Sequence, residues 1–385
     1  QMKLAASEVN LLGNKSSYIG GAIENAGTME ISGNSFYASG NSVISDEGGV
    51  LWNGGSATIN SSNVTFENNT AAIYGGAVCN SGPSSDLTIG ASGVTNTSFS
   101  KNKAVNGGAI TNYKGANLDI VGNSQTFEAN EATANGGAIH NIDSTMSIAS
   151  ETGTSFTGNS AGTAGGAVYN LNSTVNIGSD SSDIYFGANS AGNYGGAIYN
   201  EGSVLNVGGA SSTTTFEANS AGEFGGAIAS VNNDLNLIGN QVFIGNSAGN
   251  GGAISSSTST VNMYGTQTFT GNVAAGRGGA IYMQGTDAEN RSVINLTSNI
   301  GGQNSVFSGN FDSTGANAIY MDGNATLNLT TENGANIIFD DPIAGSANSN
   351  IINQSGNVYY NGNNAGFAGD FNLLSGGNAY FTAHA

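Results

Sequence analysis

Paired carboxylates are the side chains of this chain that would do hydrolytic chemistry. Glycoside hydrolysis needs two carboxyl groups at a defined separation, one as the acid and one as the nucleophile or base. The candidates are Glu128, Glu217, Asp183 and Asp287. They share no spacing motif, and Glu128 and Glu217 each directly follow a recurring Phe, which indicates a solvated row on a repeat. The sequence therefore predicts no enzymatic activity.

The charge balance disfavours anionic partners and substrates. Seven Lys and Arg residues face 26 Asp and Glu residues, which gives a formal net charge of -19. Binding to nucleic acid would be opposed by this charge. A polyuronate lyase would need cations against its substrate, and Arg277 and Arg291 are the two arginines of the chain. Nucleic acid is excluded as a partner, and a lyase is disfavoured.

Metal ligands and redox groups are sparse. Calcium-binding repeats of the Gly-Gly-x-Gly-x-Asp type are absent, and Asp340 and Asp341 are expected to be solvated charges rather than calcium ligands. His140 and His384 have no partner at ligand spacing, and Cys79 is the single cysteine. We expect no metal, no cofactor and no internal disulfide.

A Gly-Gly-Ala-Ile/Val tetrad recurs along the chain and identifies a repeat protein. Successive tetrads begin 26 to 32 residues apart when a worn copy at 48–51 is included, and a late worn copy lies at 316–319. The nine clean copies occupy residues 20–23, 75–78, 107–110, 136–139, 165–168, 195–198, 225–228, 251–254 and 278–281.

A second motif, Phe-x-x-Asn, precedes eight of the clean tetrads and the late worn one by 8 or 9 residues, counted from Phe to the first tetrad position. Phe36 is a degenerate further copy. The motif residues are Phe66, Asn69, Phe99, Asn102, Phe127, Asn130, Phe156, Asn159, Phe186, Asn189, Phe216, Asn219, Phe243, Asn246, Phe269, Asn272, Phe307 and Asn310.

Between the two motifs, apolar residues alternate with polar ones, as in Leu118 and Ile120. Alternation at period 2 predicts a strand with one buried face. Each repeat then has three short strands, formed by the tetrad, the alternating segment and the Phe segment. One repeat cannot bury its own apolar face, so repeats must stack. The sequence predicts an all-β, right-handed, single-stranded parallel β-helix of about 11–13 coils.

Side-chain directions follow from this alternation. We number positions from the first Gly of the tetrad, so that the fifth and sixth tetrad positions are the two residues that follow the tetrad. The sixth position is often Asn, which predicts that amide side chains bond to one another along the stack. The fifth position is expected to point outward. Outward Tyr would offer a partner both apolar area and a hydroxyl; the candidates for a binding surface are Tyr169, Tyr199, Tyr282 and Tyr320. The fourth position is expected to point inward and to be structural; its residues include Ile110, Ile139, Val168, Ile198, Ile228, Ile254 and Ile281.

The two motifs, recurring in phase over residues 16–320, resemble the repeats of chlamydial polymorphic outer-membrane proteins and related autotransporter passengers. The resemblance implies a β-helix displayed on the bacterial surface or secreted, exported by a C-terminal β-barrel and acting as an adhesin. No signal peptide opens this sequence and no barrel strands close it, so the barrel is expected outside it. Residues 1–320 would form the repeat β-helix, and 321–385 irregular coils that continue it.

The partner implied is an unidentified host-cell surface protein or glycan, bound through the outer faces. The alternative is a self-assembling subunit of an extracellular fibre or surface layer, because open ends of a β-helix carry unpaired backbone groups. A β-helical glycan-cleaving enzyme is the weakest alternative. No apolar stretch reaches the length of a transmembrane helix.

Overall fold

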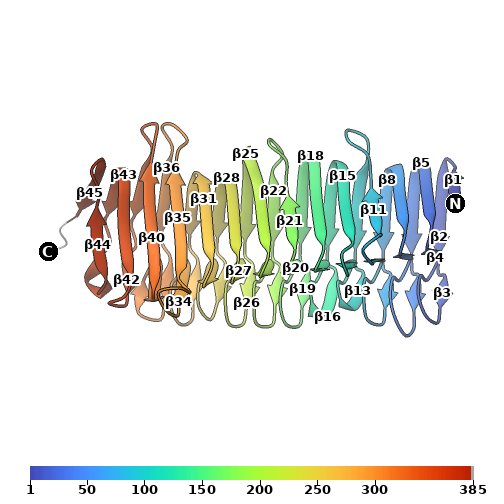
Figure 1. Cartoon of the computed structure of the whole chain (residues 1–385), viewed down its shortest axis with the longest axis horizontal. Coiled ribbons are helices and arrows are strands. Elements are labelled where there is room, and N and C mark those ends of the chain that lie inside the picture. Colours follow the sequence, from blue (N-terminus) through green and yellow to red (C-terminus); the bar gives the residue numbers. More distant parts are fainter. Residues whose placement is uncertain (383–385) are drawn as a thin grey trace. The chain divides into compact units, whose positions relative to one another are not determined.

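The chain forms a parallel β-solenoid whose strands pair into three β-sheets (Figure 1). The structure is a computed structural model that describes residues 1–382, so His384 lies outside the described residues. Two compact units are distinguished. Unit 1 comprises residues 1–192 and 197–199, and unit 2 comprises residues 193–196 and 200–385.

In unit 1, successive turns pair in parallel in each sheet. We name the sheets after their contents: the Phe sheet, the tetrad sheet and the short-strand sheet. The Phe sheet contains β1 (Met2–Ala5), β2 (Glu8–Leu12), β5 (Thr28–Ser39), β8 (Ser56–Glu67), β11 (Asp86–Ile89), β12 (Asn96–Ser100), β15 (Asn117–Glu128), β18 (Thr145–Thr157), β21 (Thr174–Ile177) and β22 (Ile184–Gly187). The tetrad sheet contains β4 (Ile23–Asn25), β7 (Leu51–Asn53), β10 (Val78–Ser81), β14 (Ile110–Tyr113), β17 (Ile139–Ile142) and β20 (Val168–Leu171). The short-strand sheet contains β3 (Lys15–Ser16), β6 (Ser42–Val43), β9 (Thr70–Ala71), β13 (Lys103–Asn106), β16 (Glu131–Asn135), β19 (Ser160–Ala161) and β23 (Ser190–Ala191).

Unit 2 repeats this organisation, and β24 (Ile198–Glu201) begins in unit 1 and ends in unit 2. Its Phe sheet contains β25 (Val204–Glu217), β28 (Asp234–Ile244), β31 (Thr260–Gly265), β32 (Gln267–Thr270), β35 (Ser292–Ser298), β36 (Asn304–Ser308), β40 (Ala325–Thr331), β41 (Asn336–Phe339), β43 (Asn350–Tyr360), β44 (Asp370–Leu373) and β45 (Gly377–Phe381). Its tetrad sheet contains β27 (Ile228–Val231), β30 (Ile254–Ser257), β34 (Ile281–Gly285), β39 (Ile319–Gly323) and β42 (Ile343–Gly345). The short strands are β26 (Ser220–Ala221), β29 (Ser247–Ala248), β33 (Val273–Ala274), β37 (Phe311–Asp312) and β38 (Gly315–Ala316), and one 3-10 helix, η1 (Asn364–Gly366), follows β43.

The predicted fold class is confirmed. Each turn contributes one tetrad strand, and 12 such strands occur in residues 1–382, within the expected 11–13 coils. The assignment of the three sides was wrong in one respect: the alternating and Phe segments lie in the same sheet, often as one long strand such as β15. The third side is the short strand that follows the motif Asn. A bulge between Gly122 and Ser124, rather than a corner, separates the two halves of β15.

The register of the Phe sheet explains why the motif recurs in phase. Between β15 and β18, Leu118 pairs with Met146 and Phe127 pairs with Phe156. Burial alternates along both strands, because successive side chains point to opposite faces. Equivalent apolar residues therefore lie above one another in the interior of each unit.

The two tetrad glycines have separate geometric roles. Gly107 has φ +64°, a left-handed conformation that favours glycine. At Gly108 a Cβ atom would lie 2.1 Å from the carbonyl oxygen of Gly137 in the next turn. The first glycine thus makes the turn, and the second permits close stacking of turns.

Candidate functional site

The motif Phe residues form a stacked column in the interior of each unit, which we call the Phe ladder. In unit 1 the ring centroids of Phe127 lie 5.2 Å from those of Phe99 and 4.6 Å from those of Phe156. In unit 2 Phe243 and Phe269 stack at 4.5 Å. Phe36 is out of register, since it pairs with Val64 and its ring is tilted by 49° to that of Phe66. All these rings are buried, so none is available to a partner.

The motif Asn residues form a hydrogen-bonded column beside the Phe ladder. We call this Asn column the corner ladder. The Oδ1 atom of Asn130 accepts from the backbone N–H of Asn102 at 3.1 Å and from its Nδ2 at 3.0 Å. The Nδ2 atom of Asn130 donates to the carbonyl of Phe99 and to Oδ1 of Asn159. Each buried amide is thereby paired on both sides, and the residue stabilises the turn rather than a ligand.

Three members of the corner ladder were missed from sequence, and the first of them, Asn14, donates its backbone N–H and its Nδ2 to Oδ1 of Asn41. Asn41 occupies the ladder position beside Asn69, although it is five residues after Phe36 instead of three. In unit 2 the ladder ends at Asp341, whose carboxylate accepts from the N–H groups of Gly309 and Asn310 and from Nδ2 of Asn310. Burial raises the pKa of Asp341, although these N–H groups act in the opposite direction. The expectation that Asp341 is a solvated charge is therefore wrong, because its side chain is 5% exposed and ends the ladder.

The sixth tetrad position forms the expected amide column only over part of unit 1. Hydrogen bonds of 2.7–2.8 Å from Nδ2 to Oδ1 join the amides of successive turns from Asn25 to Asn141. Beyond it, Nδ2 of Asn141 and both polar atoms of Asn170 are buried without a hydrogen-bond partner. The interior amides therefore differ in how well they are satisfied.

The fourth tetrad residues are fully buried in both units. Their exposed fractions are 0% at Ile110, Ile139, Val168, Ile198, Ile228, Ile254 and Ile281. These side chains contribute to the core and are not accessible to a ligand.

The fifth tetrad residues were expected to be exposed, and this is wrong for several of them. Cys79 is 0% exposed, His140 3% and Tyr282 7%, whereas Tyr169 and Tyr199 are half-buried. These side chains do point away from the interior, but residues just before the tetrads form a second row that lies against them; they include Glu47, Tyr74, Tyr194 and Phe224. We call the two rows together the outer layer.

In unit 1, the outer layer is organised around the carboxylate of Glu47, which is 9% exposed. Its Oε2 atom accepts from Nε1 of Trp52 and from Sγ of Cys79, both at 3.1 Å, and Oε1 accepts from the hydroxyl of Tyr113. Burial and the Glu47 carboxylate raise the pKa of the Cys79 thiol well above its usual value. The thiol is therefore protonated and unreactive at neutral pH.

His140 lies between aromatic rings of this layer. Its ring stacks on Tyr169 at 5.2 Å and on Tyr74 at 6.0 Å. Burial lowers the pKa of His140 from 6.5 to about 3, because charging the ring in a dry environment is costly. His140 is therefore neutral in the folded chain at physiological pH.

We expect His140 to make unit 1 less stable as the pH falls. The unfolded chain takes up a proton on His140 near pH 6.5 and the folded chain does not. The contribution of His140 to the free energy of unfolding is therefore complete above pH 6.5 and is lost as the pH falls below it. Between pH 7 and pH 5 the loss should be about 2 kcal/mol. Urea unfolding at both pH values, followed by the fluorescence of Trp52, checks this. His140→Phe should remove the difference; equal pH dependence in both proteins would contradict it.

In unit 2 the outer layer covers Tyr282. The ring lies 6.1 Å from Phe224 and 6.2 Å from Tyr320, and its hydroxyl donates to Oδ2 of Asp322 at 3.1 Å. Burial raises the pKa of Tyr282, and the neighbouring Asp322 carboxylate raises it further. Tyr320 is half-buried, with the Arg277 guanidinium 4.6 Å above its ring. Tyr282 therefore packs within the layer instead of facing solvent.

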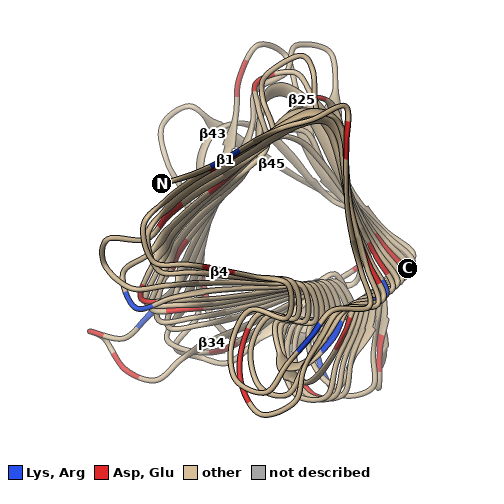
Figure 2. Cartoon of the chain, turned by 90° about the vertical axis from the view of Figure 1, so that its right-hand side faces the viewer, with Lys and Arg blue, Asp and Glu red and all other residues tan. Residues whose placement is uncertain are grey.

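The carboxylates proposed as catalytic candidates are exposed and dispersed. Glu128 and Asp183 belong to unit 1, and Glu217 and Asp287 to unit 2. Acidic segments are scattered around the turns in Figure 2. In residues 1–382 no group of three or more His, Cys, Asp or Glu side chains is placed to hold a metal ion. The absence of enzymatic activity stays a prediction.

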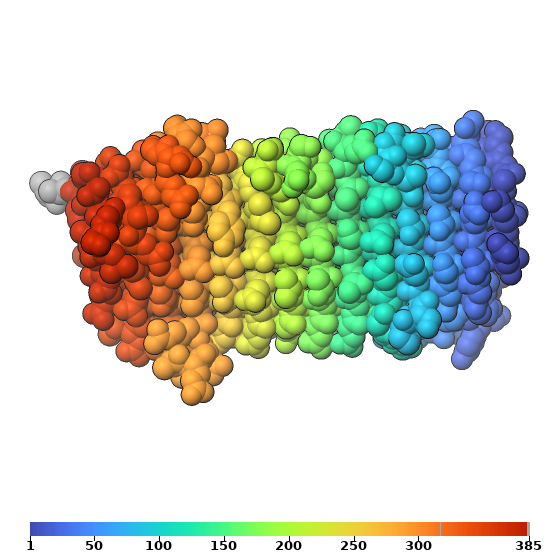
Figure 3. Space-filling view, turned by 45° about the horizontal axis from the view of Figure 1, so that its top comes forward, coloured from blue at the N-terminus to red at the C-terminus, as the bar shows by residue number. Residues whose placement is uncertain are grey.

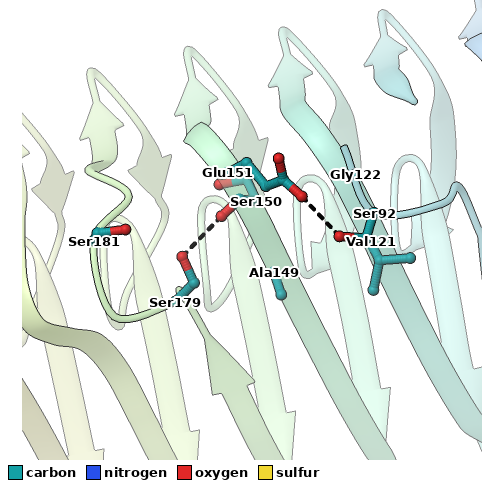
Figure 4. Close-up of a pocket in the computed structure, with 8 residues that line it drawn as sticks. All are labelled: Ser92, Val121, Gly122, Ala149, Ser150, Glu151, Ser179 and Ser181. Carbon is teal, nitrogen blue, oxygen red and sulfur yellow. Dashed lines mark hydrogen bonds between the residues drawn. The ribbon is translucent and has the colours of Figure 1, made fainter. Parts of the chain in front are cut away.

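A hollow of about 440 Å³ lies on unit 1 where the loops of several turns project (Figure 4). Serine side chains line it. The hydroxyl of Ser92 donates to Oε1 of Glu151 at 2.7 Å, and that of Ser179 donates to the carbonyl of Ser150 at 2.8 Å. Glu151 is the one ionisable group among the lining residues. The hollow offers hydrogen bonds but not the pair of carboxylates that glycoside hydrolysis requires.

Comparison with known proteins identifies the repeat. The family model of the Chlamydia polymorphic membrane protein repeat matches residues 63–81, 96–113, 153–171, 183–201 and 268–284. No curated protein and no solved structure matches the chain. No helix in the described part is long and apolar enough to cross a membrane. The family implies an outer-membrane or surface-associated location. Five segments of this β-solenoid thus match the repeat of Chlamydia polymorphic membrane proteins.

Proposed function

We propose that the chain is the adhesin-type passenger of an autotransporter-like surface protein, which binds a host or neighbouring cell through its outer faces. The observation that carries the proposal is the difference between interior and outward positions within each turn. Interior positions repeat the same Phe, Asn and aliphatic residues, whereas the exposed residue directly after the motif Phe varies, as in Glu128, Ile244 and Thr270. A constant interior with a varied exterior suits a scaffold that presents contacts. Binding, rather than catalysis, is the activity we propose.

Cell binding tests this function. The purified, labelled chain should bind cultured animal cells saturably, and excess unlabelled chain should compete. A Tyr169→Ser/Tyr199→Ser double variant should bind about fivefold more weakly or worse if the half-buried tyrosines of unit 1 contact the receptor. The matched control is Tyr18→Ser, which changes a tyrosine that is 69% exposed.

Each outcome of the cell assay has a separate meaning. Non-saturable or absent binding would contradict the adhesin function. Saturable binding that the double variant leaves intact would retain the function and remove the tyrosines as its surface. Melting followed by Trp52 fluorescence confirms that the variants are folded.

Self-assembly is a second candidate, because the outermost strands of residues 1–382 pair on one side and carry exposed apolar side chains. In unit 1, β1 and β2 pair with β5, and Leu4 and Leu12 are 37% and 59% exposed. In unit 2, β44 and β45 pair with β43, and Phe381 is 60% exposed. Such edges are templates for another strand. Light scattering that rises with protein concentration, with fibres in electron micrographs, would support this function.

A further inference from the structure

The outer face of the Phe sheet in unit 2 combines an amide column with an exposed aromatic ring. The column runs through half-buried asparagines on five strands, with each Nδ2 donating to Oδ1 of the preceding turn. The bonds are 2.7–2.8 Å long and join Asn206, Asn236, Asn262, Asn295 and Asn328. This outward column is separate from the buried ladders, and none of the repeat motifs includes it.

Each amide in the middle of this column keeps hydrogen-bonding capacity. A primary amide has two N–H donors and an oxygen with two lone pairs. The column occupies one donor and one lone pair of Asn236, Asn262 and Asn295. The remaining donor and lone pair recur once per turn, at the strand spacing of about 4.8 Å. The face therefore presents neutral donors and acceptors in a regular row.

An apolar hollow of about 280 Å³ lies beside the amides. It is lined by Ile238, Tyr264 and Ile300, among others. Ile238 and Tyr264 follow Asn236 and Asn262 by two residues, so they lie on the same face of the same strands and pair with each other in register. Tyr264 is 42% exposed. A flat ring and a row of amides thus adjoin on one face.

The charges on this face narrow the ligand class. The outward residues of β25, β28, β31, β35 and β40 include two carboxylates, Glu217 and Asp234, and no Lys or Arg. The residues that flank these strands add one cation, Arg291, and one anion, Glu332, so the net charge here stays negative and a polyanionic chain would be repelled. A neutral chain of sugar rings offers apolar ring faces for Tyr264 and hydroxyls for the amides.

We infer that this face binds a neutral glycan, with one sugar ring on Tyr264 and neighbouring hydroxyls bonded to the amides of Asn236, Asn262 and Asn295. The inference deepens the proposed function and rests on it for access to glycans outside the cell. Tyr264 and Asn262 are the residues on which binding depends most, because the hollow and the amide column meet at their strand.

Titration of the full chain with neutral and acidic oligosaccharides tests the inference. The probes are cellohexaose and chitohexaose, with hexagalacturonate as the acidic counterpart. We expect saturable binding of a neutral probe, weakened about tenfold or more by Tyr264→Ala and by Asn262→Leu. Tyr264→Phe keeps the ring and should retain binding, as should the control Tyr18→Ala. Thermal melting verifies that all variants are folded.

Three results would overturn the inference: no binding of either neutral probe, equal binding of hexagalacturonate, or neutral binding that Tyr264→Ala leaves unchanged. The cell assay separates this result from the proposed function. If the chain binds cells saturably but does not bind the neutral probes, the adhesin function is supported and the glycan site is contradicted. If Tyr264-dependent glycan binding occurs without cell binding, the site stands and the adhesin function falls.

Discussion

Phe127→Ala is expected to lower the free energy of unfolding of unit 1 by about 3–5 kcal/mol. The ring is 0% exposed and stacks on Phe99 and Phe156 at 5.2 and 4.6 Å. Removing it loses apolar burial and leaves a cavity bounded by two rigid neighbouring turns. Stacked turns cannot close this gap without disturbing the register of the sheet. Urea unfolding followed by Trp52 fluorescence measures the loss.

The matched control for this change is the adjacent outward residue. Thr126 is half-buried on the solvent side of the same strand, so Thr126→Ala should change the stability by about 0.5 kcal/mol or less. Because solenoids unfold locally as well as globally, hydrogen exchange should locate the Phe127→Ala effect in β12, β15 and β18. A loss below about 1 kcal/mol would refute the role assigned to the ladder.

Asn130→Ala should cost about as much, although it removes a polar side chain. The substitution leaves the backbone N–H of Asn102 and the carbonyl of Phe99 without their partners in the interior. Each buried group left unpaired costs about 1–3 kcal/mol, and the bond to Asn159 is lost as well. The expected total is about 3–5 kcal/mol, measured by urea unfolding.

An exposed amide provides the control for Asn130→Ala. Nδ2 of Asn123 donates to Asn96 at the surface, at 3.0 Å, so Asn123→Ala should cost about 0.5 kcal/mol or less. In hydrogen exchange, the amide of Asn102 should lose protection only in Asn130→Ala. Similar stability of the two variants would mean that water replaces the lost bonds and that the corner is not dry.

The sequence predicted the solenoid because its interior is periodic. The residues equivalent to Phe127 and Ile139 recur in phase in most turns, and this periodicity reflects stacking directly. It did not reveal that the alternating and Phe segments share a sheet, because Gly122 at the bulge between them looks the same in sequence as a glycine at a corner.

The outer layer was not predictable in the same way. Tyr282 alternates with buried Ile281 and so looks exposed, but its cover comes from Phe224 and Asp322 in other turns. The covering residues differ from turn to turn and leave no periodic signal. The amide column at Asn236 and Asn262 was not predicted, because the same outward position holds Asp119 and Ser147 in other turns and so belongs to no motif.

The corner ladder of unit 2 has a direction. In the bonds between its amide side chains, each Nδ2 donates to the Oδ1 of the following turn and each Oδ1 accepts from the preceding turn. Its amide dipoles are therefore aligned, with the positive end at Asn310, as at the first turn of an α-helix. Asp341 places a carboxylate against that end. The column is thus a line of parallel dipoles terminated by a counter-charge, an electrostatic polarity in a protein that contains almost no helix.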